Sequence, residues 1–271
     1  MRLLFLCLLF VVFPVMSQEA PPLSAEIAYL TTDGTLYLLD TNNNTTREIG
    51  QDIDEILGWS PEGDYLAVRD NNYSVIRVID DDGETVFSIE ITESLLFNNW
   101  HWSPDGTRAF YTGLDLTSDE AVSNVMLVDA ESGDVTETIS LYDNERPQGW
   151  FPGGEAILME QFGDLLRYDL AEGTFQFLTG FPPGYIRTLS WHPEDEYVYF
   201  ITDQSSVFGG ISETGIDRQC LFALNLADQS VEELYCGGTD SPPIDVTVSP
   251  SGTYIVAVSQ FEIATLQVDS D

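Results

Sequence analysis

The sequence contains no lysine and few basic residues of any kind. Its 271 residues include nine arginines and 46 acidic residues, which gives a formal net charge of −37 at pH 7. A surface of this charge repels polyanions, and this excludes nucleic acid and anionic membranes as partners. Adaptation to high salt, binding of cations or of a basic protein, and plain solvation of the surface would each produce such a composition.

The sequence also lacks long apolar runs beyond its first residues. Arg2 precedes an apolar stretch over residues 3–16, and the small residues Val15 and Ser17 lie just before Gln18. A charged start, a short apolar core and a small-residue cleavage site are typical of a secretory signal peptide. We therefore expect a signal peptide over residues 1–17, a single mature domain over 18–271, a secreted or periplasmic location, and no membrane insertion after cleavage.

Cysteine is rare, and only two cysteines lie outside the predicted signal peptide. Cys220 and Cys236 flank a predicted hairpin that turns at about Asp228, so that they face each other on consecutive strands. A cross-strand disulfide is geometrically reasonable, and it would persist in an oxidising compartment. Two separate thiols are the alternative.

What the sequence does contain is a repeat of strand, tight turn and strand. Residues 102–106 read Trp-Ser-Pro-Asp-Gly, and variants of this motif begin at Trp59, Trp150, Trp191 and Val248, with a degenerate first copy at Pro22. Pro, Asp and Gly suit a turn that reverses the chain. Because the period is about forty residues with about four strands, it predicts the blades of a β-propeller.

The repeat resembles a known family. The motif, an aliphatic strand after it, a strand that ends in Asp and a turn with Gly together resemble the TolB-like propellers built from WD40-like PD40 repeats. The resemblance covers residues 22–271 and implies an all-β, six-bladed β-propeller whose first and last blades are incomplete. Such propellers serve as periplasmic scaffolds, as gating domains of serine peptidases and as secreted proteins of other kinds. The sequence contains neither the amino-terminal domain of TolB nor a hydrolase domain.

A binding site is expected on the face that carries the long loops, which we call the loop-rich face. In a propeller the loops between blades share a face with the loops that join second and third strands, and binding is usually built on loops. The two longest insertions, residues 113–124 and 203–219, are both loops of the second kind. The candidate binding residues are Asp52, Asp54, Glu55, Trp100, His101, Asp143, Glu145, Arg146, Tyr185, Arg187 and Asp240. The alternative is that these are solvated loop residues without a binding role.

The tryptophans have a structural interpretation. Trp59, Trp102, Trp150 and Trp191 recur two residues before the proline of the repeat, which favours packing between blades over ligand stacking. Trp100 lies outside this register. Because it lies two residues before Trp102 on one strand, we expect both side chains on the same face.

Catalytic motifs are not found. The sequence has no Gly-x-Ser-x-Gly elbow, and its two histidines lie apart, His101 at the expected start of an inner strand and His192 within a turn. Two distant histidines do not predict a zinc site, and Asp80-Asp81-Asp82-Gly83 lacks the alternating ligands of a calcium loop. We therefore expect no metal, no cofactor and no catalytic residues.

The sequence thus favours one function over another. The first is an exported, monomeric propeller scaffold that binds a protein partner or small ligand through the loop-rich face. The alternative is an exported propeller enzyme, a hydrolase or lyase, that uses carboxylates on that face, since the many acidic residues could supply a pair.

Overall fold

The computed structural model describes most of the chain beyond its amino-terminal segment. The described residues are 26–70, 72–91, 95–115, 122–141, 145–162, 164–180, 185–192, 197–203, 219–236, 243–249, 252–259 and 263–267. The predicted signal peptide and most of the two predicted long loops lie outside them. The chain divides into two compact units, Met1–Gln51 and Asp52–Asp271. Each unit is described by itself.

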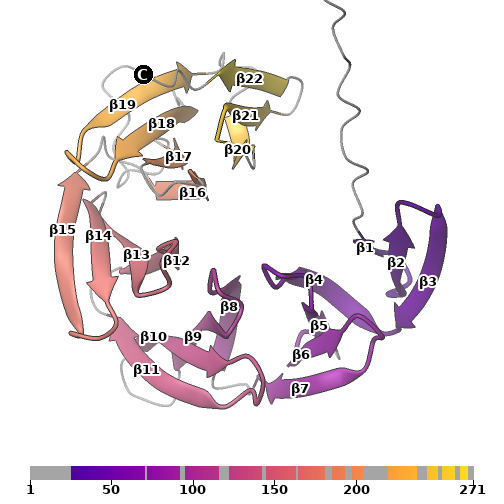
Figure 1. Ribbon diagram of the computed structural model, residues 1–271. Helices are drawn as coiled ribbons and strands as arrows, with labels where there is room; N and C mark the ends of the chain where they lie inside the picture. Colours follow the sequence, from indigo (N-terminus) through magenta and orange to yellow (C-terminus); the bar gives the residue numbers. More distant parts are fainter. Residues whose placement is uncertain are drawn as a thin grey trace, which may run out of the picture. The chain divides into compact units, whose positions relative to one another are not determined.

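The described part of the first unit is one three-stranded antiparallel sheet. Its strands β1 (Glu26–Leu30), β2 (Leu36–Asp40) and β3 (Thr45–Gly50) follow one another in sequence order (Figure 1). Leu36 and Leu38 of β2 are buried. The Asn-rich turn after β2 is held by Asp40, whose carboxylate accepts the backbone N–H of Asn42 at 2.8 Å. This hydrogen bond explains why a polar turn separates the two strands.

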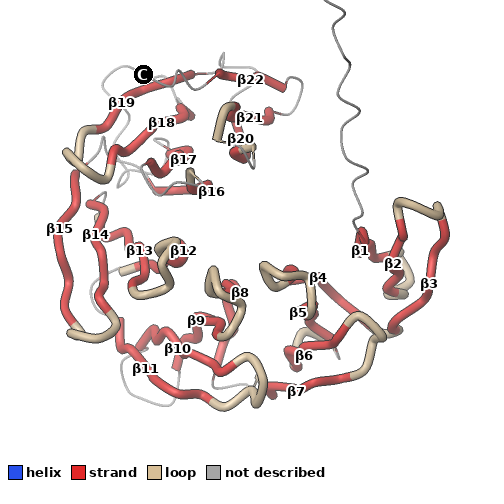
Figure 2. Tube along the Cα trace, viewed as in Figure 1, coloured by secondary structure: helices blue, strands red, loops and turns tan. Residues whose placement is uncertain are grey.

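The second unit contains five sheets, each an antiparallel meander in sequence order (Figures 1 and 2). Four have four strands and the last has three. The first two sheets are β4 (Ile53–Trp59), β5 (Tyr65–Asp70), β6 (Val75–Asp80), β7 (Thr85–Glu90) and β8 (Leu95–Trp102), β9 (Arg108–Asp115), β10 (Val122–Asp129), β11 (Val135–Leu141). The others are β12 (Arg146–Trp150), β13 (Ala156–Gln161), β14 (Asp164–Asp169), β15 (Thr174–Gly180); β16 (Tyr185–Trp191), β17 (Tyr197–Asp203), β18 (Gln219–Asn225), β19 (Val231–Cys236); and β20 (Pro243–Val248), β21 (Tyr254–Ser259), β22 (Ile263–Gln267).

These sheets confirm the predicted fold class, an all-β protein with the six sheets of a six-bladed propeller. The first and last sheets have three strands each, as predicted. Strands β9 and β10 extend into the predicted loop 113–124, of which residues 116–121 lie outside the described part. Among the described residues, no helix is long and apolar enough to cross a membrane.

The repeated turn is held by its serine. The backbone N–H of Tyr65 donates to Ser60 Oγ, that of Arg108 to Ser103 Oγ and that of Tyr254 to Ser249 Oγ, each at 3.0 Å. In the second sheet of this unit, Ser103 Oγ also lies 2.6 Å from Asp105 Oδ1, and this hydrogen bond is the main cause that lowers the pKa of Asp105. The recurring Ser-Pro-Asp-Gly is therefore a folding signal for the turn.

The repeat tryptophans join neighbouring sheets, as predicted. Trp102 Nε1 donates to the backbone oxygen of Gly58, and Trp150 Nε1 donates to that of His101, both at 3.0 Å. In both pairs the acceptor directly precedes the repeat tryptophan of the preceding sheet. The indole thus fills the space between two sheets and satisfies a carbonyl on the inner strand of the preceding sheet.

Trp100 also packs between sheets. It is 7% exposed and belongs to the core that sheets β4–β7 and β8–β11 share. Its ring stacks on Tyr111 and meets Trp102 edge-on, with the Trp100 and Trp102 ring centroids 5.4 Å apart. The expectation that Trp100 and Trp102 share a face is therefore confirmed.

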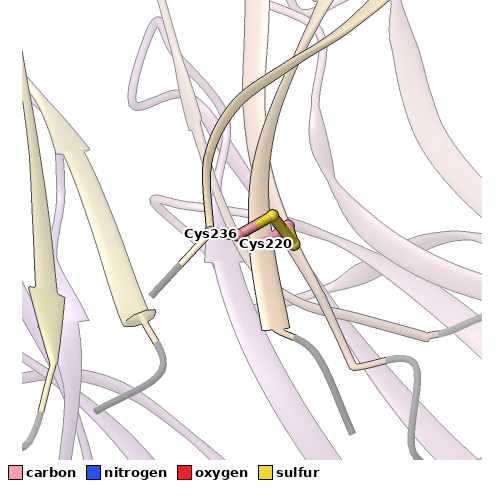
Figure 3. The surroundings of a disulfide bond; sticks show 2 residues. All are labelled: Cys220 and Cys236. Carbon is pink, nitrogen blue, oxygen red and sulfur yellow. A yellow bond between two sulfur atoms is a disulfide. The ribbon is translucent and has the colours of Figure 1, made fainter. Parts of the chain in front are cut away.

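The predicted disulfide is present. Cys220 on β18 and Cys236 on β19 are register partners, and their sulfur atoms are bonded (Figure 3). Cys220 is buried among the apolar side chains between sheets β12–β15 and β16–β19. The bond therefore ties the outer strand of its sheet to the core.

Candidate functional site

The predicted binding residues fall in several places. Asp52 precedes β4, Asp54 and Glu55 lie at its start, and Glu145 and Arg146 lie at the start of β12. Tyr185 begins β16 and Arg187 follows in it, whereas Asp143 and Asp240 lie outside the described residues. Trp100 and His101 lie near the end of β8, so the expectation that His101 starts an inner strand is wrong. The strand begins six residues earlier, at Leu95.

At the end where β4 begins, the sheet β4–β7 gathers a group of charged and aromatic side chains that we call the acidic corner. It consists of Asp52, Asp54, Glu55, Arg69, Asp70, Tyr73 and Arg77. Asp54 Oδ2 accepts the backbone N–H of Tyr73 at 2.9 Å. Arg69 pairs with Glu55, and its guanidinium carbon lies 4.7 Å from the centroid of the Tyr73 ring. The start of β4 and the β5–β6 turn are thereby fixed to each other.

The electrostatics of the acidic corner centre on Asp70. Arg77 Nε lies 2.9 Å from Asp70 Oδ2. Even so, the pKa of Asp70 is raised, chiefly because burial disfavours its charged form. The charge of Arg77 lowers this pKa, and the negative charges of Asp54 and Asp52 raise it. Three carboxylates therefore act on one another here, and the two arginines offset part of their charge.

The backbone of the acidic corner is constrained. Asp52, Asn72 and Tyr73 have positive φ angles of 59°, 58° and 64°, in the left-handed region that residues other than glycine rarely occupy. Tyr73 is 53% exposed. A bulky side chain held at the surface by a sparsely populated conformation often marks a functional position. Sequence reasoning missed Arg69, Asp70 and Tyr73, although the polar turn after β5 was a signal for them.

A cavity of about 600 Å³ lies within the second unit, against the inner strands β4, β8, β12 and β16. Most of its lining comes from the later part of each strand and from the turns that follow, away from the acidic corner at the start of β4. All five tryptophans of the chain line it. Asn99, Gln148 and Thr188 add neutral polar groups, and in the part of the chain that the structure describes none of the lining residues is Asp, Glu or Arg. Sequence reasoning did not predict this cavity.

His101 is the titratable group of the cavity lining. Its ring stacks on Phe110 with the centroids 4.7 Å apart, and its Nε2 atom is buried without a hydrogen-bond partner among the described residues. Burial lowers the pKa of His101 to about 4. The imidazole is therefore neutral at pH 7, and the described residues that line the cavity carry no charge.

This pKa predicts a loss of stability in mild acid. The pKa of His101 is about 4 in the folded state and 6.5 without burial, so the unfolded state binds more protons between these values. The contribution of the neutral imidazole is thus complete above pH 6.5 and is lost as the pH falls toward 4. The free energy of unfolding, measured in urea from pH 7 down to pH 4, should fall more steeply for the wild type than for His101→Gln. Parallel curves would contradict the assignment.

The described residues contain one group of three side chains whose donor atoms could meet at a metal ion. Donor atoms of Cys220, Glu233 and Cys236 lie within 4.8 Å of one another. Both sulfur atoms are bonded to each other, so neither is available as a thiolate ligand. The acidic corner and the cavity form no further group of this kind among the described residues.

Comparisons with known proteins agree on the fold. No protein-family model and no curated protein matches the chain. Among solved structures, Kuenenia stuttgartiensis hydrazine synthase matches at TM-score 0.59 and 16% identity, over 82% of this chain and 67% of that one. An oligogalacturonate lyase in complex with manganese matches at TM-score 0.60 and 13% identity, over 82% and 64%. The chain thus spans less than two thirds of the lyase.

A putative TolB from Agrobacterium tumefaciens is the third similar structure. It matches at TM-score 0.56 and 18% identity, over 83% of this chain and 80% of that one. All three identities are low, so the similarity supports the propeller fold and no shared activity.

Proposed function

We propose that the chain is an exported scaffold of the TolB-like, PD40-repeat kind, which binds a protein partner through its loop-rich face. The similarity in fold to a TolB structure supports the family assignment. The signal-like first residues and the disulfide favour an extracytoplasmic location, where disulfides persist. The mature protein acts as a monomer outside the membrane, and it uses no cofactor.

The observation that carries this proposal is the presentation of Tyr73 at the acidic corner. The side chain is exposed, its backbone is held by the Asp54 carboxylate, and Arg69 lies over its ring. Tyrosine and arginine are enriched at the centres of protein interfaces. Because the surrounding carboxylates attract positive charge, the partner is a protein with a basic contact surface.

The second candidate, an exported hydrolase or lyase, has one observation in its favour. The pKa of Asp70 is raised, as that of a carboxyl group that acts as a general acid often is. However, Arg77 occupies one oxygen of Asp70, and an ion pair of this kind also has a purely structural use. The scaffold is therefore the better-supported function.

A pull-down from an envelope extract of the source organism tests the proposal. The wild type should capture a basic protein, and the triple variant Asp52→Asn, Asp54→Asn, Glu55→Gln should lose it. The matched control is Asp81→Asn, Asp82→Asn, Glu84→Gln, which removes the same charge from the β6–β7 turn, at the other end of the sheet. Tyr73→Ala should weaken capture at unchanged charge. Equal capture by both triple variants would contradict a specific site.

A further inference from the structure

The tryptophan-lined cavity differs in chemistry from the rest of the molecule. The chain carries a net charge of −37, yet none of the described residues that line this space is acidic or an arginine. Trp59, Trp102 and Trp191 are half-buried there, so parts of their rings remain accessible. A volume of about 600 Å³ is that of a small-molecule site. The cavity is therefore a neutral, aromatic site within an acidic protein.

The inner strands are irregular where they line the cavity. The pairing register shifts between Ile56 and Gly58, between Asn98 and Trp100, and between Pro147 and Gly149. The unpaired residue at each shift is Leu57, Asn99 or Gln148, and all three line the cavity. Bulges of this kind redirect side chains and are frequent beside functional sites. The fourth lining strand, β16, also shifts its register, between Ile186 and Thr188, so all four inner strands give up regular pairing near the cavity.

The bulges bring two amide side chains to the cavity. Asn99 is exposed and has a φ of 57°, and Gln148 is half-buried. Neither amide group forms a hydrogen bond with another described residue. An amide offers both donors and an acceptor, and it matches a hydroxyl group without a change of charge. Asn99 and Gln148 therefore supply polar recognition beside the indole rings.

From this combination we infer that the cavity binds a neutral saccharide of one or two rings. The apolar face of a sugar ring stacks on the indoles, and its hydroxyls pair with the amides of Asn99 and Gln148. An apolar ligand would leave both amides unpaired, and a charged sugar would lose its hydration without finding an opposite charge. The site lies away from the acidic corner, so the two binding functions are independent.

Intrinsic fluorescence tests the inference on the full chain, because all five tryptophans line the cavity. The probes are maltose, cellobiose, lactose and diacetylchitobiose, with digalacturonate as the charged comparison. At least one neutral disaccharide should shift the emission saturably, and digalacturonate should not. No response to any neutral probe, or a response to digalacturonate alone, would overturn the inference.

Two variants locate the site. Gln148→Leu and Asn99→Gly each remove one amide, and each should weaken binding about tenfold, the loss expected for one hydrogen bond. The matched control is Asn44→Gly, which changes an exposed asparagine of similar backbone conformation, with φ 52°, in the turn after β2 and outside both proposed sites, and it should bind like the wild type. Unchanged affinity in both cavity variants overturns the inference. Protein capture by the acidic corner tests the proposed function separately.

Discussion

Replacing Trp102 by alanine should lower the free energy of unfolding of the second unit by about 3–4 kcal/mol, because a half-buried aromatic side chain costs somewhat less to remove than a fully buried one. The substitution empties space between sheets β4–β7 and β8–β11 and leaves the backbone oxygen of Gly58 without its indole donor. Urea denaturation followed by far-UV circular dichroism measures the change.

Two further variants separate packing from hydrogen bonding. Trp102→Phe keeps an aromatic ring but removes the N–H, and the unpaired carbonyl should cost about 1–3 kcal/mol. Phe177→Ala, at a ring that is 56% exposed, should have little effect. If Trp102→Ala were no more destabilising than Phe177→Ala, the indole would not join the sheets.

Removal of the disulfide should have the second largest effect. The bond closes a loop with a sequence separation of 16, and restriction of the unfolded chain by such a loop stabilises the fold by about 3 kcal/mol. Reduction of the wild type and the double variant Cys220→Ala, Cys236→Ala should both lower the free energy of unfolding by about this amount. The double variant should not respond to reductant. A wild type that is equally stable with and without reductant would favour two separate thiols.

Much of the fold could be predicted because it depends on local patterns. The turn motif recurs in register, and its serine and aspartate bind the turn that they mark, as at Ser103 and Asp105. The pairing of Cys220 with Cys236 followed from counting residues about a hairpin turn. Such features need only the sequence period and the turn chemistry.

The sites could be predicted only in part, because they depend on departures from the pattern. Asp54 was a candidate, but its partner Tyr73 lies 19 residues away and meets it through a left-handed backbone. The inner strands bulge at similar places, but the amides of Asn99 and Gln148 at two of these bulges do not recur in the other strands, so the repeat does not predict them. Gly149 beside one of these bulges is a weak sequence signal of irregular pairing.

The central claim is that the repeating tryptophans hold neighbouring sheets together through their indole N–H groups. Hydrogen exchange of the indole N–H groups, measured by NMR on ¹⁵N-tryptophan protein and assigned with single Trp→Phe variants, tests it most directly. The indole protons of Trp102 and Trp150 should be strongly protected, because each donates to a backbone carbonyl of the preceding sheet. Exchange of both protons at the rate of an exposed indole would contradict the claim.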